Sequence, residues 1–144
     1  MANKKDREII FNKYDGRCSY CGTKLQKGWH VDELLPIIRE KHHKRDADGT
    51  PIKDKNNNYV FNIVIKYPER LNIDNQMPSC SSCNINKHSM SLEEFRSLIE
   101  GFMKHLNKIN TQYKIAKRYG LVTEDIKPVV FYFEREALNA MEEH

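Results

Sequence analysis

The four cysteines have the spacing that says most about chemistry. They form two pairs, Cys18-Ser-Tyr-Cys21 and Cys80-Ser-Ser-Cys83. Two thiolates separated by two residues can both bind one ion from a tight turn, and a second such turn completes a tetrahedron of sulfur ligands. Four sulfur ligands that leave no open position are typical of structural zinc. The competing interpretation is two redox motifs or four unrelated buried thiols. We expect zinc, with residues 22–79 inserted between the two pairs.

Polar residues that could bind a divalent ion and activate water lie near these pairs in the sequence: Asp32, Glu33, Asp74, Asn75, Asn84, Lys87 and His88. Asn84 and His88 are four residues apart, so a helix that starts at the second cysteine pair would turn both to one side. Asp32 could join them to hold a hard cation through oxygen and one nitrogen, with positions open for water and phosphate. This grouping predicts metal-assisted hydrolysis of a phosphodiester.

The segments that must position these residues alternate between helical and extended patterns. We expect a helix over 4–14, strands over 29–36 and 59–67, and a hairpin or mobile loop over the polar segment 39–58. Ser91-Leu-Glu-Glu94 is a capping box that opens a helix reaching Ile109. Further elements expected along the chain are a helix over 111–119, a short strand over 129–133, and a helix or frayed end over the last eleven residues. The predicted fold class is a small α+β domain around zinc.

Length and composition limit the functional classes. The chain has 144 residues, enough for one domain, with 24 Lys and Arg against 20 Asp and Glu and a formal net charge of +4. This charge permits a nucleic-acid partner without requiring one. No apolar run approaches the roughly 20 residues of a membrane-spanning helix, and the first ten residues lack the apolar core of a secretory signal. We therefore expect a cytoplasmic protein with no membrane partner and reduced cysteines.

The stretch 101–123 is basic and contains no acidic residue. Tyr113 and Tyr119 are interleaved with its basic residues, which are Lys104, Lys108, Lys114, Lys117 and Arg118. One interpretation is a solvated helix face. The other is a DNA-binding face that follows the phosphate backbone and gives salt-dependent affinity without sequence preference. Lys87 is a further candidate for a phosphate contact, or else an exposed residue.

Three motifs in this chain also resemble a known family. They are Cys18-x-x-Cys21-Gly22, Val31-Asp32-x-Leu34-x-Pro36, and Asp74-Asn75-x-x-Pro78-x-Cys80-x-x-Cys83-Asn84-x-x-Lys87. Together they resemble the HNH endonucleases, especially the small phage and bacterial type braced by a four-cysteine zinc. The resemblance covers about residues 15–100. It implies a zinc-braced ββα-metal core that cuts double-stranded DNA with Mg²⁺ or Mn²⁺, followed by a helical extension over about 101–144, all within one domain of residues 1–144.

The resemblance also implies roles for individual residues. Asp32 and Asn84 would be ligands of the catalytic ion, and His88 would be a third ligand, because one branch of the family has a His at this spacing. Asn75 would brace the loop and orient the base. Cys18, Cys21, Cys80 and Cys83 would hold the structural zinc. A single ββα site implies nicking, and double-strand cleavage would require a homodimer.

One position departs from the family pattern. The residue directly after Asp32 is the general-base His in the family, and here it is Glu33. A Glu carboxyl has a reference pKa about two units below that of His, so it is a weaker base unless burial raises its pKa. Glu33 is a slower working base, or His30 on the same side of the strand replaces it, or the site is disabled. In the last case the protein would be a catalytically silent, zinc-braced module that binds DNA or a protein partner.

Overall fold

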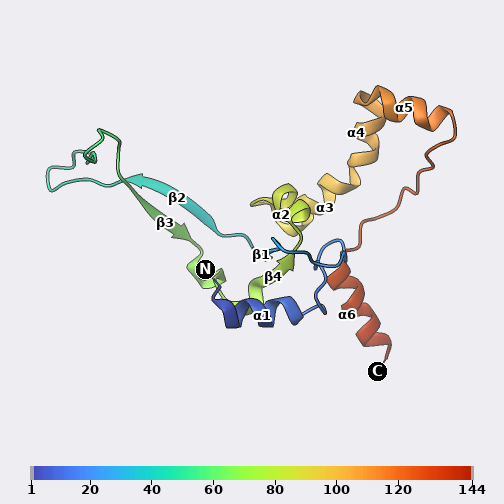
Figure 1. The fold of residues 1–144 in the computed structure, drawn as a ribbon, viewed down its shortest axis with the longest axis horizontal. Coiled ribbons are helices and arrows are strands. Elements are labelled where there is room, and N and C mark those ends of the chain that lie inside the picture. Colours follow the sequence, from blue (N-terminus) through green and yellow to red (C-terminus); the bar gives the residue numbers. More distant parts are fainter. Residues whose placement is uncertain (1, 144) are drawn as a thin grey trace.

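The computed structural model describes residues 2–143 as an α+β structure with two separate two-stranded sheets (Figure 1). In chain order its helices and strands are α1 (Lys4–Asn12), β1 (His30–Glu33), β2 (Ile38–His43), β3 (Phe61–Lys66), β4 (Gln76–Ser79), α2 (Ser81–Lys87), α3 (Leu92–Glu100), α4 (Phe102–Ile109), α5 (Thr111–Arg118) and α6 (Tyr132–Glu142). Two 3₁₀-helical turns, Pro68–Arg70 and Ile73–Asn75, connect β3 to β4. The α+β class predicted from the sequence is confirmed. Within the described residues 2–143, no helix is both long and apolar enough to cross a bilayer.

The sheet nearest the cysteines is the antiparallel pair β1–β4. Asp32 lies opposite Met77 and Glu33 lies opposite Gln76. β4 leads through Cys80 directly into α2, because Cys80 is the N-cap residue of that helix. Two strands and a helix therefore form one compact ββα unit, which α1 covers by packing against β4. The strand predicted over 29–36 is confirmed as β1, whereas β4 was not predicted.

The core lies beside this unit and is mainly aromatic. The ring of Tyr20 meets those of Phe95 and Phe131 edge-on, at centroid distances of 5.7 and 5.6 Å. Cys18, Leu25 and Met77 complete the buried cluster. The core thus joins the first cysteine pair, β4, α3 and the segment before α6, which are far apart in the sequence. The first cysteine pair is held in place by this packing as well as by any bound metal.

The second sheet is a long hairpin that projects away from the core (Figure 1). β2 and β3 pair antiparallel from Ile38 opposite Lys66 to His43 opposite Phe61. We call residues 38–67 the arm. The polar segment 39–58 forms most of β2 and the tip of this hairpin, whose second strand, β3, is the strand predicted over 59–67. Beyond the strands, the backbone N–H of Lys44 donates to Val60 O at 2.9 Å and continues the pairing toward the tip.

The C-terminal part is helical, and here two predictions need correction. The capping box at Ser91 is confirmed, but the helix expected to reach Ile109 is divided into α3 and α4 at Gly101. The strand expected over 129–133 is wrong. Phe131 is buried in the core. The N–H groups of Tyr132 and Phe133 donate to the backbone oxygens of the two residues between Cys18 and Cys21. With its hydrogen bonds satisfied there, this segment pairs with no strand, and α6 begins at Tyr132.

Candidate metal centre and adjoining pocket

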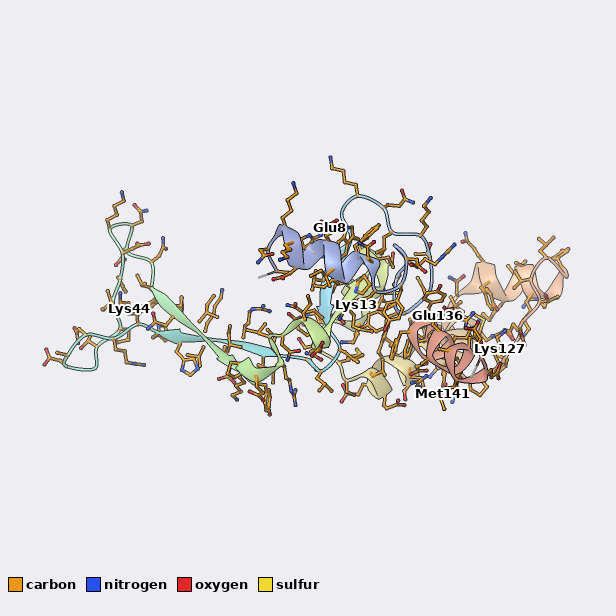
Figure 2. The ribbon with its side chains drawn as sticks, turned by 90° about the horizontal axis from the view of Figure 1, so that it is seen from below. Glu8, Lys13, Lys44, Lys127, Glu136 and Met141 are labelled. Carbon is orange, nitrogen blue, oxygen red and sulfur yellow. The ribbon has the colours of Figure 1, made fainter. Side chains whose placement is uncertain are left out.

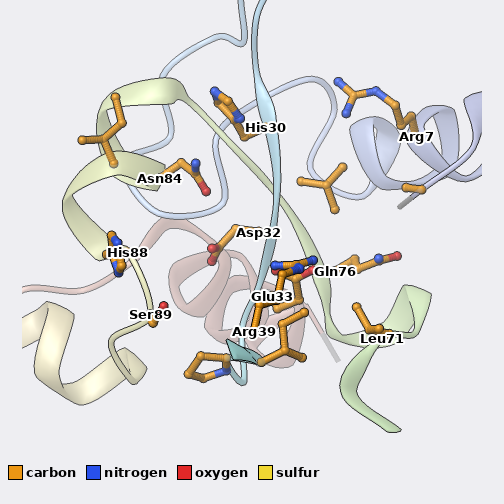
Figure 3. A pocket seen from close by; sticks show the side chains of 15 residues that line it. Arg7, His30, Asp32, Glu33, Arg39, Leu71, Gln76, Asn84, His88 and Ser89 are labelled. Carbon is orange, nitrogen blue, oxygen red and sulfur yellow. The ribbon is translucent and has the colours of Figure 1, made fainter. Parts of the chain in front are cut away.

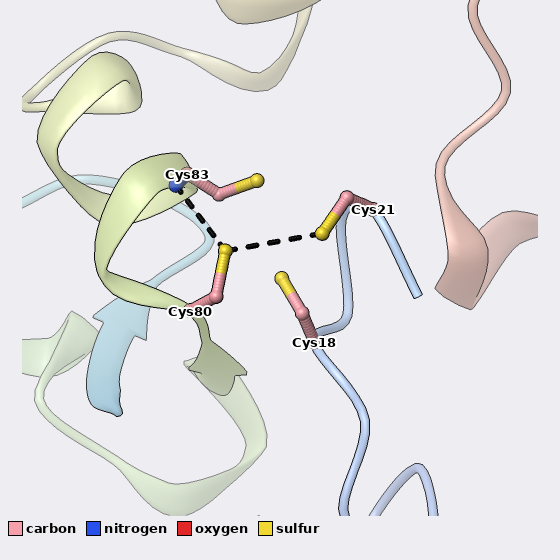
Figure 4. A group of neighbouring side chains, drawn as sticks. All are labelled: Cys18, Cys21, Cys80 and Cys83. Carbon is pink, nitrogen blue, oxygen red and sulfur yellow. Dashed lines mark hydrogen bonds between the residues drawn. The ribbon is translucent and has the colours of Figure 1, made fainter. Parts of the chain in front are cut away.

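The four cysteine side chains converge although residues 22–79 separate the two pairs (Figure 4). Their sulfur atoms all lie within 4.8 Å of one another. The Sγ atoms of Cys21 and Cys80 are 3.8 Å apart. Tetrahedral zinc with Zn–S bonds of about 2.3 Å would separate its sulfur ligands by about 3.8 Å. The cluster therefore has the donor set and the dimensions to hold a metal ion.

The electrostatics of the thiols favour a bound cation. The Cys83 thiol and nearby backbone N–H groups donate hydrogen bonds to Cys18, and these bonds lower its pKa to about 4. Burial, together with the charge on Cys18, raises the pKa of Cys21 to about 11. One thiolate therefore forms readily, while further ones repel it at close range. A metal ion bound among the four sulfur atoms would remove this repulsion between thiolates.

A pocket of about 620 Å³ lies beside α2, the helix that Cys80 caps (Figure 3). β1, α2 and the base of the arm form its walls. Five of the residues predicted to carry chemistry line it together: His30, Asp32, Glu33, Asn84 and His88. In Figure 3 the Asn84 and His88 side chains lie on the α2 side, and Asp32 lies on β1 between them and Glu33. Asn84 and His88 thus share one side of the pocket, although His88 follows the last residue of α2 and has the non-helical φ of +49°.

Asp32 is held by two buried neighbours that the sequence did not indicate. Its Oδ2 atom accepts a hydrogen bond from the Tyr20 hydroxyl and lies 3.0 Å from Lys87 Nζ. Lys87 also donates to the backbone oxygen of Glu33 at 3.1 Å. Both contacts use Oδ2, so the other carboxylate oxygen keeps its lone pairs for a cation in the pocket. Burial raises the pKa of Asp32, and the attraction of Lys87 opposes that rise.

Both alternatives expected for Lys87, a phosphate contact and an exposed residue, are wrong. Its side chain is 0% exposed, because the ammonium is enclosed between Asp32 and the ring of Tyr20, 5.9 Å from the ring centroid. A buried charge of this kind is stable only when it is paired. Lys87 therefore positions and neutralises Asp32. Spacing along the sequence gave no signal for this pair, since it depends on the packing of α2 against β1.

Asn75 braces the chain directly behind the pocket. Its side-chain oxygen accepts from the N–H of Leu35 at 2.8 Å, and its amide donates to the oxygens of Leu35 and Arg70, each at 2.9 Å. These bonds fix the turn after Glu33 to the turn before β4. This geometry is the bracing that the resemblance implies for Asn75. Orientation of a catalytic base by Asn75 stays a prediction.

The basic residues of the C-terminal helices are only partly available to a ligand. Lys104 and Lys108 lie on α4, and Lys114, Lys117 and Arg118 lie on α5. Glu124 directly follows the basic stretch 101–123, and its carboxylate pairs with Lys117 on α5 at 3.1 Å. Lys117 also donates to Asn107. Lys117 is therefore already paired with a carboxylate, while DNA contact by the other four residues stays a prediction.

Replacing Lys87 with methionine should destabilise the protein strongly. Methionine roughly fills the same space but leaves the Asp32 carboxylate buried without its cation, which typically costs about 3–5 kcal/mol. Urea unfolding of the zinc-loaded protein, followed by circular dichroism, measures this loss. The matched control is Lys127→Met, which breaks the exposed pair of Lys127 with Asp125 and should cost about 0–1 kcal/mol. Equal midpoints for the two variants would contradict the pairing role of Lys87.

Comparison of the chain with protein-family models, with curated proteins and with solved structures finds no match. The described residues define an α+β protein with four clustered cysteines that could hold a metal ion. Beside the cluster lies a pocket lined by carboxylate, amide and imidazole side chains. Functional assignment therefore rests on the chemistry of these two sites.

Proposed function

We propose that the protein is a metal-dependent endonuclease of the HNH type that nicks double-stranded DNA. The observation that carries this proposal is the β1–β4–α2 unit, which gathers Asp32, Glu33, Asn84 and His88 around one pocket. Carboxylate and amide oxygens are ligands that Mg²⁺ and Mn²⁺ prefer, and imidazole is also used. The exposed side chain of His30 lines the pocket, so the pocket reaches the surface and a phosphodiester can enter it.

In this proposal the two metals have different roles. The four cysteines hold a structural zinc ion, which fixes the first cysteine pair against the start of α2. The free oxygen of Asp32, the amide oxygen of Asn84 and the imidazole of His88 would hold the catalytic ion. Bound Mg²⁺ or Mn²⁺ would polarise the scissile phosphodiester and stabilise the leaving oxygen. Lys87 and Tyr20 hold the Asp32 carboxylate in place for this task.

Two side chains can take the proton from the attacking water. Glu33 lines the pocket and is half-buried, and its backbone is fixed by Lys87. His30 also lines the pocket, is exposed, and lies two residues before Asp32 on the same side of β1. An imidazole has a reference pKa closer to neutrality, whereas Glu33 holds the position of the base in the HNH pattern. We propose Glu33 as the base and His30 as its alternative.

A second candidate is a catalytically silent module that uses the same fold to bind DNA or a protein. The observation that favours it is the ion pair of Asp32 with Lys87, at 3.0 Å. An ammonium at this carboxylate supplies positive charge that a catalytic cation would otherwise supply. Glu33 adds negative charge where an anionic phosphate must bind. In this alternative the zinc cluster is retained and the pocket holds no catalytic ion.

Substitution of Glu33 by histidine discriminates between these functions. A well-placed general base contributes about 10²–10⁴-fold, so Glu33→His should raise the nicking rate by about 10²-fold if the remaining site is sound. The measurement is the rate of conversion of supercoiled to open-circular plasmid in Mn²⁺. Gln76→His is the matched control, because Gln76 pairs with Glu33 across the sheet and lines the same pocket. If Glu33→His does not raise the nicking rate and the protein does not bind Mn²⁺, the enzyme proposal is overturned.

A further inference from the structure

The arm has two chemically different faces. Side chains alternate along a strand, and residues directly opposite one another on paired strands share a face. One face, which we call the basic face, carries three residues of β2 and their three partners on β3: Arg39, Lys41, His43, Phe61, Ile63 and Ile65. The other face carries Ile38, Glu40, His42, Asn62, Val64 and Lys66. Figure 2 shows side chains projecting from the arm, with Lys44 just beyond β2.

Positive charge is cancelled on one face and uncancelled on the other. On the second face Glu40 pairs with Lys66 at 2.6 Å and with His42 at 3.2 Å. The basic face has no acidic residue, and the structure gives Arg39 and Lys41 no carboxylate partner among the described residues. Its cations therefore stay free to pair with an external anion.

The basic face is continuous with the candidate site. Arg39, at its base, lines the same pocket as Asp32 and Glu33. Farther out, the ring of His43 lies 4.7 Å from that of Phe61, and Lys41 Nζ lies 6.0 Å from the centroid of the same ring. Basic and aromatic groups thus extend from the pocket along one side of the arm. A polyanion held at the pocket would meet this face next.

The arm as a whole also carries a positive net charge. Seven basic residues lie in it, Arg39, Lys41, Lys44, Arg45, Lys53, Lys55 and Lys66, against four acidic ones, Glu40, Asp46, Asp48 and Asp54. The arm therefore has an excess of three positive charges, and residues 101–123, with five basic residues and no acidic one, form the other basic segment. Apolar residues on the basic face are exposed as well, Ile63 by 61% and Phe61 by 43%. An apolar surface flanked by cations suits a groove between phosphate strands.

We propose that the basic face of the arm is a DNA-binding surface, which contacts the phosphate backbone of the duplex beside the site of cleavage. The major groove, about 12 Å wide, admits a two-stranded β-ribbon, and Arg39 and Lys41 would then reach phosphates on its rim. Contacts of this kind give salt-dependent affinity and set the position of the duplex. The proposal takes its ligand from the proposed nuclease function, but binding can be measured without cleavage.

The two faces offer a matched pair of double variants. Lys41→Gln/His43→Asn changes the basic face, and Lys66→Gln/His42→Asn makes the same changes on the other face. Both pairs remove the same residue types and the same net charge. The measurement is fluorescence anisotropy of a labelled duplex of about 30 base pairs, with zinc-loaded protein in Ca²⁺ to prevent cleavage, over a range of salt concentrations.

The basic-face variant should bind about tenfold more weakly at 0.1 M salt, and its log–log salt slope should fall by about one, because one phosphate contact is lost. The control variant should bind like the wild type. Thermal unfolding should be the same for both variants, which keeps misfolding separate from lost contact. Equal affinities for the two variants, or no binding of duplex by the wild-type protein, would overturn the proposal.

Failure of this inference and failure of the nuclease proposal can be told apart. Duplex binding that depends on the basic face, without nicking of plasmid in Mg²⁺ or Mn²⁺, would support DNA binding by the arm and reject the nuclease function. Nicking of plasmid, together with equal duplex affinity of the two double variants, would support the nuclease and reject DNA binding by the basic face. A second copy of the chain could also cover the exposed apolar residues of the basic face. Analytical ultracentrifugation tests this by measuring whether the protein is a monomer or a dimer. A dimer broken only by the basic-face variant, with DNA affinity unchanged, would assign this face to self-association and overturn DNA binding.

Discussion

Replacing Cys80 with serine should abolish zinc binding and unfold the centre of the chain. Cys80 contributes one of the four clustered sulfur atoms and is also the N-cap residue of α2. Structural zinc typically contributes about 10–16 kcal/mol to folding, which is comparable to the whole stability of a domain, about 5–15 kcal/mol. Loss of one ligand therefore removes the ion and with it the link between the first cysteine pair and α2.

The measurement combines zinc content by mass spectrometry with far-ultraviolet circular dichroism. Cys80→Ser should contain less than a tenth of the zinc of the wild type and should lose much of its helical signal. Ser81→Ala is the control, because Ser81 is the next residue, is exposed, and offers no metal ligand. Circular dichroism that is unchanged both by chelation and by Cys80→Ser would contradict a structural zinc ion.

Replacing Asn84 with alanine should abolish cleavage while the zinc content stays that of the wild type. Asn84 lines the pocket on the α2 side and, in the proposed mechanism, supplies an oxygen ligand of the catalytic ion. Loss of several kcal/mol of transition-state stabilisation corresponds to a fall of about 10³-fold in rate. The rate of plasmid nicking under single-turnover conditions measures this effect.

A neighbouring asparagine on the same helix provides the control for this variant. Asn86 lies two residues farther along α2, is exposed, and bonds only to the backbone of its own helix. Asn86→Ala should therefore retain full activity. Equal cleavage by Asn84→Ala and the wild type would remove Asn84 from the site. Loss of zinc in Asn84→Ala would show instead that the substitution disturbs the neighbouring cluster.

Features that depend on local spacing could be predicted from the sequence. The two cysteine pairs predicted a four-sulfur cluster, since few other arrangements use thiols in this pattern without disulfides. The capping box at Ser91 was predicted because its hydrogen bonds connect residues three positions apart. Asn84 and His88 do line the same pocket, but His88 lies just beyond the end of α2 with φ +49°, so helical periodicity alone does not account for its position. The two residues of each cysteine pair and the two ends of the capping box lie within one turn, whereas the meeting of the two cysteine pairs depends on the tertiary fold.

Features that depend on packing between distant segments could not be predicted in this way. The hydroxyl of Tyr20 reaches Asp32 because the neighbouring Ser19 bonds to Pro78 O on β4, the strand that pairs with β1. Lys87 has the charge of a DNA-binding residue, but its position on α2 buries it against Asp32. Phe131 has strand-forming neighbours, yet it enters the aromatic core and ends the extended segment there. Burial and tertiary hydrogen bonding override local pattern at these positions.

The measurement that tests the central claim most directly is nicking of supercoiled plasmid by zinc-loaded protein in Mg²⁺ or Mn²⁺, with Asn84→Ala assayed in parallel. The proposed site predicts open-circular product that requires the added ion, is stopped by EDTA, and is lost in Asn84→Ala. Glu33 would then be a working base or a tolerated neighbour of one. No cleavage by protein that contains zinc and still binds the plasmid would contradict the nuclease and favour the silent binding module.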